Sequence, residues 1–195
     1  MNEDRFLLIG CGILRKEINF IIKKNDWPLD TLFLDSALHI NLDKLAKSLA
    51  SALSSRAGQK KIVFFGACHP QMEKMLAHAG TFRTAGQNCV EMMLGEQAFA
   101  EELETGAFFL LEDWARRWNE IVTLSIGKNR QVIREIFRED RKYLLCLRTV
   151  CSGDFTEEAQ EAGRIVDLPA YWRDVSLDKL ESVLLTALRR KMQEK

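Results

Sequence analysis

The sequence predicts an α/β protein with a mainly parallel sheet and helices on both faces. Two observations predict it: short, continuously apolar runs alternate along the chain with segments that have apolar residues at helical spacing. Strands without polar alternation are typical of a sheet that helices cover on both sides. At 195 residues, with no repeat, low-complexity tract or linker, the chain is expected to form one three-layer, Rossmann-like domain over residues 1–195.

Six apolar runs are expected to be strands, because each is short and ends at turn residues or at a helix start. They are residues 6–9, 32–34, 62–65, 108–111, 143–147 and 165–168. A further extended piece is expected at residues 81–84. The run at 62–65 is the strongest of these strand signals.

Amphipathic helices are expected after most of these runs, including a last one from Ser176 to the C-terminal part of the chain. Asn41 stands where it can cap the helix that carries Leu42, Leu45, Leu49 and Leu53. Asn88 and Glu91 have the spacing of a capping box, which places Cys89 in the first turn of another helix.

Composition excludes several classes of protein. The chain is 47% hydrophobic, which is too apolar for a disordered protein. Lys and Arg total 28 and so do Asp and Glu, so the chain lacks the net positive charge typical of nucleic-acid binding. No apolar run approaches the roughly 20 residues of a membrane span. The acidic start lacks a signal-peptide pattern, and a cytoplasmic location without nucleic-acid or membrane partners is expected.

The five cysteines stand at positions 11, 68, 89, 146 and 151, an odd number with irregular spacing. A secreted disulfide scaffold is normally smaller and has an even number of cysteines. In a reducing compartment these thiols indicate metal binding, redox or nucleophilic chemistry, or simply small buried side chains. The position of each cysteine in the fold decides between them.

Four metal-ligating residues leave the expected elements at one edge. Cys11 follows the first strand, His39 the second and Cys68 the third, while Cys89 begins a helix. Ligands of parallel sheets bind beyond the carboxyl ends of the strands. We therefore expect Cys11, His39, Cys68 and Cys89 to converge on one centre, with buried cysteines along the sheet edge as the alternative.

Such a Cys/His set suits a borderline-soft ion, zinc first, with iron or corrinoid cobalt as alternatives. Helix N-termini favour the thiolate form. Three thiolates in a partly desolvated cleft would repel one another without a cation, so a bound ion is expected to accompany them.

The remaining cysteines and histidines are weaker candidates. Cys146 lies inside an apolar strand and is expected in the core, and His78 is expected to be structural or solvated. His69 and Cys151 are reserve ligands that could replace one of the four. His69, beside Pro70, could equally hydrogen-bond its own turn.

Glu112 and Asp113 follow an apolar run, where they could supply a general base or a hard ligand. The alternative is that Asp113 caps the next helix. Trp114 could bind a cofactor; together with Trp118, Tyr171 and Trp172, it could wall a pocket or simply pack in the core.

A partial dinucleotide-binding pattern also occurs. Gly10 and Gly12 follow the first strand, and Asp35 closes the second. Arg15 occupies the position of the third glycine, where close helix–sheet packing needs a small residue. Gly10 and Gly12 therefore remain only minor candidates for cofactor binding.

The chain resembles the family named domain of unknown function 1638 over roughly residues 6–172. The resemblance is carried by Cys11-Gly-Ile-Leu-Arg-Lys-Glu17, Leu38-His39, Gly66-Ala-Cys68, Asn88-Cys89-Val-Glu-Met-Met-Leu-Gly95 and Gly106-Ala-Phe-Phe-Leu. It implies Cys11, His39, Cys68 and Cys89 as the characteristic residues. It also implies an origin in anaerobic archaea or bacteria, beside corrinoid-dependent methyltransferase systems.

Two segments depart from the family pattern. Many members have Tyr-Gly-Leu-Cys where this chain has Phe65-Gly-Ala-Cys68, and His-Asp-Cys where it has Gln87-Asn88-Cys89. The family pattern therefore does not define supporting roles for the neighbours of Cys68 and Cys89.

The function expected from these observations is metal binding through three cysteines and one histidine. The chain would be a metalloenzyme or an accessory of corrinoid-linked methyl transfer, with a small molecule or a corrinoid protein as partner. The alternative is a non-catalytic metal or corrinoid carrier or sensor. An open coordination position would indicate catalysis, and a closed one storage.

Overall fold

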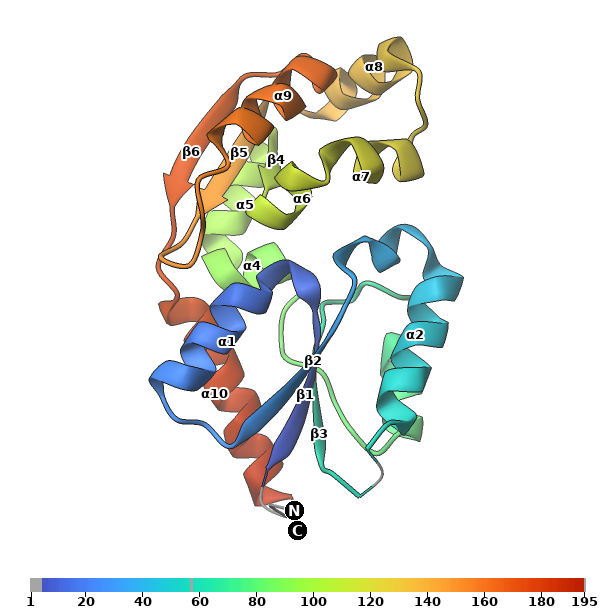
Figure 1. Cartoon of the computed structure of the whole chain (residues 1–195), viewed down its shortest axis with the longest axis vertical. Coiled ribbons are helices and arrows are strands. Elements are labelled where there is room, and N and C mark those ends of the chain that lie inside the picture. Colours follow the sequence, from blue (N-terminus) through green and yellow to red (C-terminus); the bar gives the residue numbers. More distant parts are fainter. Residues whose placement is uncertain (1–4, 57, 195) are drawn as a thin grey trace. The chain divides into compact units, whose positions relative to one another are not determined.

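The computed structural model describes residues 5–56 and 58–194 of the chain. Within that part of the chain, six strands form two three-stranded sheets, and every strand pairs in parallel with its neighbours. The α/β class with parallel strands is confirmed (Figure 1). A single sheet was expected, whereas each sheet belongs to its own compact unit.

The first unit comprises the described residues up to Met93 and those from Leu177 onward. Its sheet contains β1 (Phe6–Cys11), β2 (Leu29–Leu34) and β3 (Lys61–Phe64) in the order β2-β1-β3. The central strand β1 is almost entirely buried because the sheet is covered on both faces. This burial explains its continuous apolar run.

Helices cover both faces of this sheet. Figure 1 shows α1 (Arg15–Lys24) and α10 (Asp178–Gln193) on one side and α2 (Leu42–Ser54) on the other. Leu45, Leu49 and Leu53 of α2 are buried as predicted, whereas Leu42 is 43% exposed. Asn41 accepts a 3.0 Å hydrogen bond from the Lys44 amide as the predicted cap of α2. The remaining helical segments before residue 80 are η1 (Gly12–Leu14), η2 (Ser36–Ile40) and α3 (Met72–His78).

The predicted extended piece at residues 81–84 lies against β3. Val63 and Arg83 form an isolated parallel bridge. The Val63 amide donates to the Phe82 carbonyl at 3.1 Å, and the Thr84 amide donates to the Val63 carbonyl at 2.8 Å. The chain is thereby held beside the carboxyl end of β3 until it enters α4 (Cys89–Leu94).

The second unit spans Leu94–Ser176. Its sheet contains β4 (Ala107–Leu110), β5 (Tyr143–Arg148) and β6 (Ala170–Asp174) in the order β4-β5-β6. Its helices are α5 (Glu96–Glu104), α6 (Glu112–Arg116), α7 (Trp118–Ser125), α8 (Arg130–Asp140) and α9 (Thr156–Val166). Trp118, Phe137 and Phe155 are buried in its core, and Trp114 and Trp172 pack against it.

The prediction of a strand at residues 165–168 is wrong. Ile165 and Val166 are the last turn of α9, and the strand that follows is β6. Both residues are buried on the same helix face as Ala159 and Ala162. An apolar run of this length fits a buried helix end as well as a strand, so periodicity alone could not separate the two.

No helix in the two described segments has both the length and the apolar character needed to cross a membrane.

Candidate functional site

Cys11 is the last residue of β1 and is buried, 7% exposed. From β1 the chain passes to β2 on one side and then returns to β3 on the other. The carboxyl end of β1 is therefore the point where the strand order reverses, which is where ligands bind in open parallel sheets. Cys11 thus stands at the expected ligand site of the first unit.

Cys68 follows β3, the direct neighbour of β1, and is half-buried. The loop that carries it is held against the segment before α4. The Ala67 amide donates a 2.8 Å hydrogen bond to the Gln87 carbonyl. A Cβ at Gly66 would overlap that carbonyl oxygen and would lie 2.6 Å from the Cα of Asn88, so only glycine allows this approach.

Cys89 is the first residue of α4 and is 9% exposed. The start of α4 is fixed by two side chains, as the predicted capping box implies. Asn88 Oδ1 accepts from the Glu91 amide at 2.9 Å, and the Glu91 carboxylate accepts from the Gln87 amide at 3.2 Å. The same segment that holds the Cys68 loop therefore also orients Cys89.

The three thiols interact with one another. A side-chain hydrogen bond with Cys11, followed by burial and by the neighbouring Cys11 and Cys68 sulfurs, holds the pKa of Cys89 well above its ordinary value. Burial, and then Cys11, also raises the pKa of Cys68. Without a cation, the thiols of Cys68 and Cys89 are therefore protonated and neutral near pH 7, so they do not repel each other as thiolates would.

Arg83 has the opposite influence on Cys68. Its positive charge, together with a hydrogen bond to the Gly66 backbone, lowers the pKa of Cys68 but is outweighed by burial. The guanidinium is fixed by Glu73 at 2.6 Å and by the Gly86 carbonyl at 2.6 Å. A fixed cation near the half-exposed thiol favours its thiolate form when a proton acceptor or a metal ion is present.

His39 lies in η2, after β2, and its side chain is exposed. Desolvation lowers its pKa, and a hydrogen bond to the backbone of Ser36 acts in the opposite direction. The groups that shift the pKa values of Cys68 and Cys89 do not include His39. The interactions described above link Cys11, Cys68 and Cys89, and His39 follows β2, which lies on the opposite side of β1 from β3.

The thiol cluster has the donor chemistry of a metal site but not its closed arrangement. Among residues 5–56 and 58–194, no three His, Cys, Asp or Glu side chains are already arranged as a metal-binding group. Cys11, Cys68 and Cys89 nevertheless supply the sulfur donors that zinc uses, at one position in the fold. The residues fit a thiolate-bound ion by their chemistry, and binding requires the thiols to lose protons and to close around it.

Glu112 and Asp113 belong to the second unit, in the first turn of α6. The Glu112 carboxylate accepts from the Gly153 amide at 3.0 Å and from Arg116 at 3.0 Å. Asp113 lies 4.0 Å from Arg117. The residue that precedes α6 is Leu111, so the prediction that Asp113 caps this helix is wrong. These contacts give Glu112 a clear role in holding the loop at Gly153.

The other candidates have local contacts. His69 Nδ1 accepts from the Gln71 amide at 3.0 Å, so the histidine closes its own turn. Cys151 lies in a turn of the second unit, where its amide donates to Thr149 at 3.1 Å. Cys146 is fully buried in β5, as predicted, and burial raises its pKa to about 12. His78 is solvent-exposed on α3.

Gly10 and Gly12 pack against β2. A Cβ at Gly12 would lie 2.8 Å from the Leu34 carbonyl oxygen, and one at Gly10 would lie 3.2 Å from the Phe33 ring. Arg15 stacks on that same ring at 5.4 Å. Contacts within the sheet thus explain both glycines and the arginine that interrupts the dinucleotide pattern. Trp114, the other minor cofactor candidate, is half-buried against the core of the second unit.

Sequence reasoning missed the residues that join the thiol-bearing loops, namely Gly66, Arg83 and Gln87. Their roles depend on contacts between segments that are about twenty positions apart. The only local signal was Gly66 itself, because a glycine in a loop can mark a place where two backbone segments approach closely.

The geometry defines an α/β protein with a cluster of three thiols at the switch point of its first sheet. A family model described as "Protein of unknown function (DUF1638)" matches residues 33–184, and the chain belongs to this family. His39, Cys68 and Cys89 lie inside the matched segment, and Cys11 precedes it. No curated protein and no solved structure matches the chain.

Proposed function

We propose that Cys11, Cys68 and Cys89 bind one transition-metal ion, preferably zinc, and that the chain is a metal-dependent protein of methyl-transfer metabolism. The observations that support the proposal are the side-chain hydrogen bond between Cys89 and Cys11 and the electrostatic influence of Cys68 on Cys89, at the sheet switch point. The link to corrinoid-dependent methyl transfer depends on the family resemblance alone.

The three thiols suit metal binding better than a passive core. Buried cysteines in a core need no charged neighbour, whereas Cys68 is half-exposed and has Arg83 nearby. When an ion binds, its charge offsets the repulsion among the thiolates and replaces the protons that they release. The bound ion would supply Lewis acidity toward one further ligand.

His39 is the proposed fourth ligand. Desolvation lowers its pKa, so the imidazole is neutral near pH 7 and can donate a nitrogen lone pair. One ring nitrogen can keep its hydrogen bond to the Ser36 backbone, which orients the ring, while the other nitrogen binds the ion. If His39 occupies the fourth coordination position, the site is closed and suits storage. If a small molecule can occupy that position instead, the site is open and suits catalysis.

The half-exposed position of Cys68 favours the catalytic alternative. Cys11 and Cys89 are buried, so Cys68 forms the side of the cluster that solvent and a small substrate can reach. In that arrangement Cys11 and Cys89 hold the ion on the buried side. A ligand that enters from solvent would cover Cys68 more than the other two thiolates.

Anaerobic titration with cobalt(II), which reports thiolate ligation through its absorption bands, tests the proposal. Wild-type protein should bind one ion per chain. Cys68→Ser and Cys89→Ser should each weaken binding by more than about 100-fold, beyond the 10–100-fold typical of changes in residues that only hydrogen-bond to a ligand. Cys151→Ser is the matched control and should bind like the wild type. Full metal binding by both serine variants would refute the site.

A further inference from the structure

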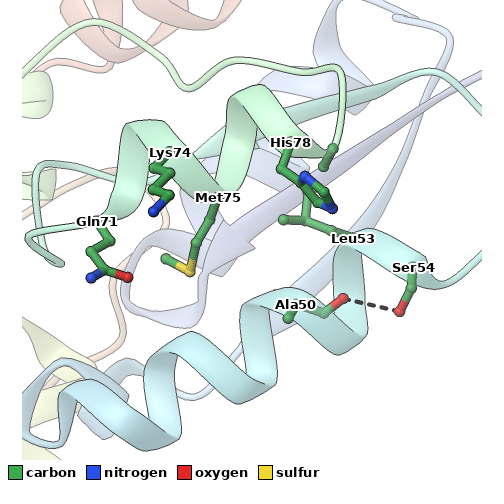
Figure 2. A pocket seen from close by; sticks show the side chains of 8 residues that line it. Ala50, Leu53, Ser54, Gln71, Lys74, Met75 and His78 are labelled. Carbon is green, nitrogen blue, oxygen red and sulfur yellow. Dashed lines mark hydrogen bonds between the residues drawn. The ribbon is translucent and has the colours of Figure 1, made fainter.

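A groove lies between α2 and α3 in the first unit, apart from the residues assigned to the thiol cluster. Its volume is about 710 Å³, which is within the range of small-molecule sites. Figure 2 shows the side chains of α3 directed toward α2 across it. Its lining residues are Ala50, Leu53, Ser54, Gln71, Lys74, Met75, His78 and Ala79.

The floor of the groove is apolar. Figure 2 shows Ala50 and Leu53 of α2 opposite Met75 of α3, and Ala79 is a further apolar lining residue. The Ser54 hydroxyl, at one end, donates to the Ala50 carbonyl at 3.0 Å and so does not compete for a ligand. Methionine is a flexible and polarizable side chain that adapts to an apolar ligand.

Among the described residues that line the groove, the ionisable side chains are Lys74 and His78, and none is an acid. Lys74 and His78 lie one turn apart on α3, and both are exposed. Within the part of the chain that the structure describes, neither side chain has a hydrogen-bond or ion-pair partner. No carboxylate lines the groove, and the neighbouring Glu73 is paired with Arg83 at 2.6 Å.

We propose that this groove binds an amphiphilic monocarboxylate, such as a medium-chain aliphatic acid. The apolar body would lie on Leu53 and Met75, and the carboxylate would meet Lys74 and His78. Charge complementarity favours the anion, because the described lining offers the Lys74 ammonium and the N–H donor of His78 but no acid.

The size of the groove favours a small molecule over a partner helix. The α3 wall, from Gln71 to Ala79, is about 12 Å long at the rise of an α-helix. A docked helix uses anchors spread over about two turns. The α2 wall contributes only Ala50, Leu53 and Ser54, residues of its last turn or so.

Titration of protein labelled with ¹³C in its methionine methyl groups tests this assignment. Sodium decanoate, below its micelle concentration, should shift the Met75 signal in a saturable manner. The exposed Met192, with 60% of its surface accessible, reports non-specific association. Its signal should not follow the saturation curve of the Met75 signal. The Met75→Leu variant assigns the signal.

Two comparisons separate charge recognition from simple apolar contact. Decanol should bind about fivefold more weakly than decanoate, as expected for a partly exposed ion pair. Lys74→Gln and His78→Gln should each weaken decanoate binding by about threefold to fivefold and leave decanol unchanged, whereas Lys179→Gln on α10 should change neither. Equal affinities for decanoate and decanol, or parallel shifts at Met75 and Met192, would overturn the proposal. None of these readouts depends on the thiols.

Discussion

The Ala67 amide donates a 2.8 Å hydrogen bond to the carbonyl of Gln87. This bond joins the loop after β3 to the segment before α4, and each of these carries one of the clustered thiols, Cys68 and Cys89. Neither segment is part of a regular ladder. The contact between Ala67 and Gln87 therefore sets how closely the two thiols can approach.

Gly66→Ala should disrupt this contact. The added methyl group would overlap the Gln87 carbonyl and crowd the Asn88 Cα, and both are backbone atoms that cannot move aside like a flexible side chain. We expect a loss of about 1–3 kcal/mol in the free energy of unfolding, as for other overpacked sites. Metal affinity should also fall. Chemical denaturation and cobalt(II) titration measure the two effects.

Ala67→Gly is the control for Gly66→Ala, because it keeps the N–H donor and adds no atoms. It should retain metal binding within a few-fold and lose roughly 1 kcal/mol or less from added backbone freedom. If Gly66→Ala binds metal as tightly as Ala67→Gly, the close approach to Gln87 does not position the thiols.

Much of the first sheet and its thiols could be predicted from the sequence. The strands ending at Cys11 and before Cys68 are continuous apolar runs, and the rule for ligand sites in parallel sheets then places both cysteines at one edge. Cys89 was placed at a helix start by the spacing of Asn88 and Glu91, which the structure confirms.

The pairing of strands could not be predicted in the same way. The alternation of strands and helices along the sequence is the same for one six-stranded sheet and for two three-stranded sheets. Which strands pair depends on contacts between segments that are distant in the sequence. The position of His39 illustrates the limit. It follows a strand, as predicted, but β2 lies on the opposite side of β1 from β3, and the histidine contacts the Ser36 backbone.

His39 should become a metal ligand when an ion binds. X-ray absorption of the zinc-loaded protein should show three sulfur atoms at about 2.3 Å and one nitrogen atom at about 2.0–2.1 Å. His39→Ala should replace the nitrogen by a solvent oxygen while all three sulfur atoms remain. A spectrum that the His39→Ala substitution leaves unchanged would show that η2 does not take part and that the fourth position is open in the wild type.

Glu112 should act on the stability of the second unit and not on metal binding. Its carboxylate, 12% exposed, holds the Gly153 amide and Arg116. Removal of a charged acceptor from such partners costs about 1–3 kcal/mol. Glu112→Ala should lower the free energy of unfolding by that amount and keep full cobalt(II) binding, while the exposed Glu104→Ala should change neither. Loss of the metal in Glu112→Ala would instead support the ligand role considered from the sequence.

Cys146 should make the second unit less stable in alkali. Burial in β5 raises the pKa of this thiol to about 12, whereas in the unfolded chain the thiol titrates near its ordinary value of 9.0. Between these values the unfolded chain binds fewer protons than the folded one, so the free energy of unfolding falls as the pH rises. Below pH 9 the thiol is protonated in both states and has no such effect.

The pH effect of Cys146 can be isolated by comparison with Cys146→Ala. Every other titrating group is common to the two proteins, so the difference between their free energies of unfolding should fall by about 1.4 kcal/mol per pH unit above pH 9.5 or so. Urea unfolding followed by tryptophan fluorescence suits the measurement, because Trp114, Trp118 and Trp172 all lie in the second unit. The cavity left by Cys146→Ala will lower the free energy of unfolding by the same amount at every pH, so it does not change how that free energy depends on pH. Parallel stability curves for the two proteins would mean that Cys146 ionises in the folded protein as readily as in the unfolded chain.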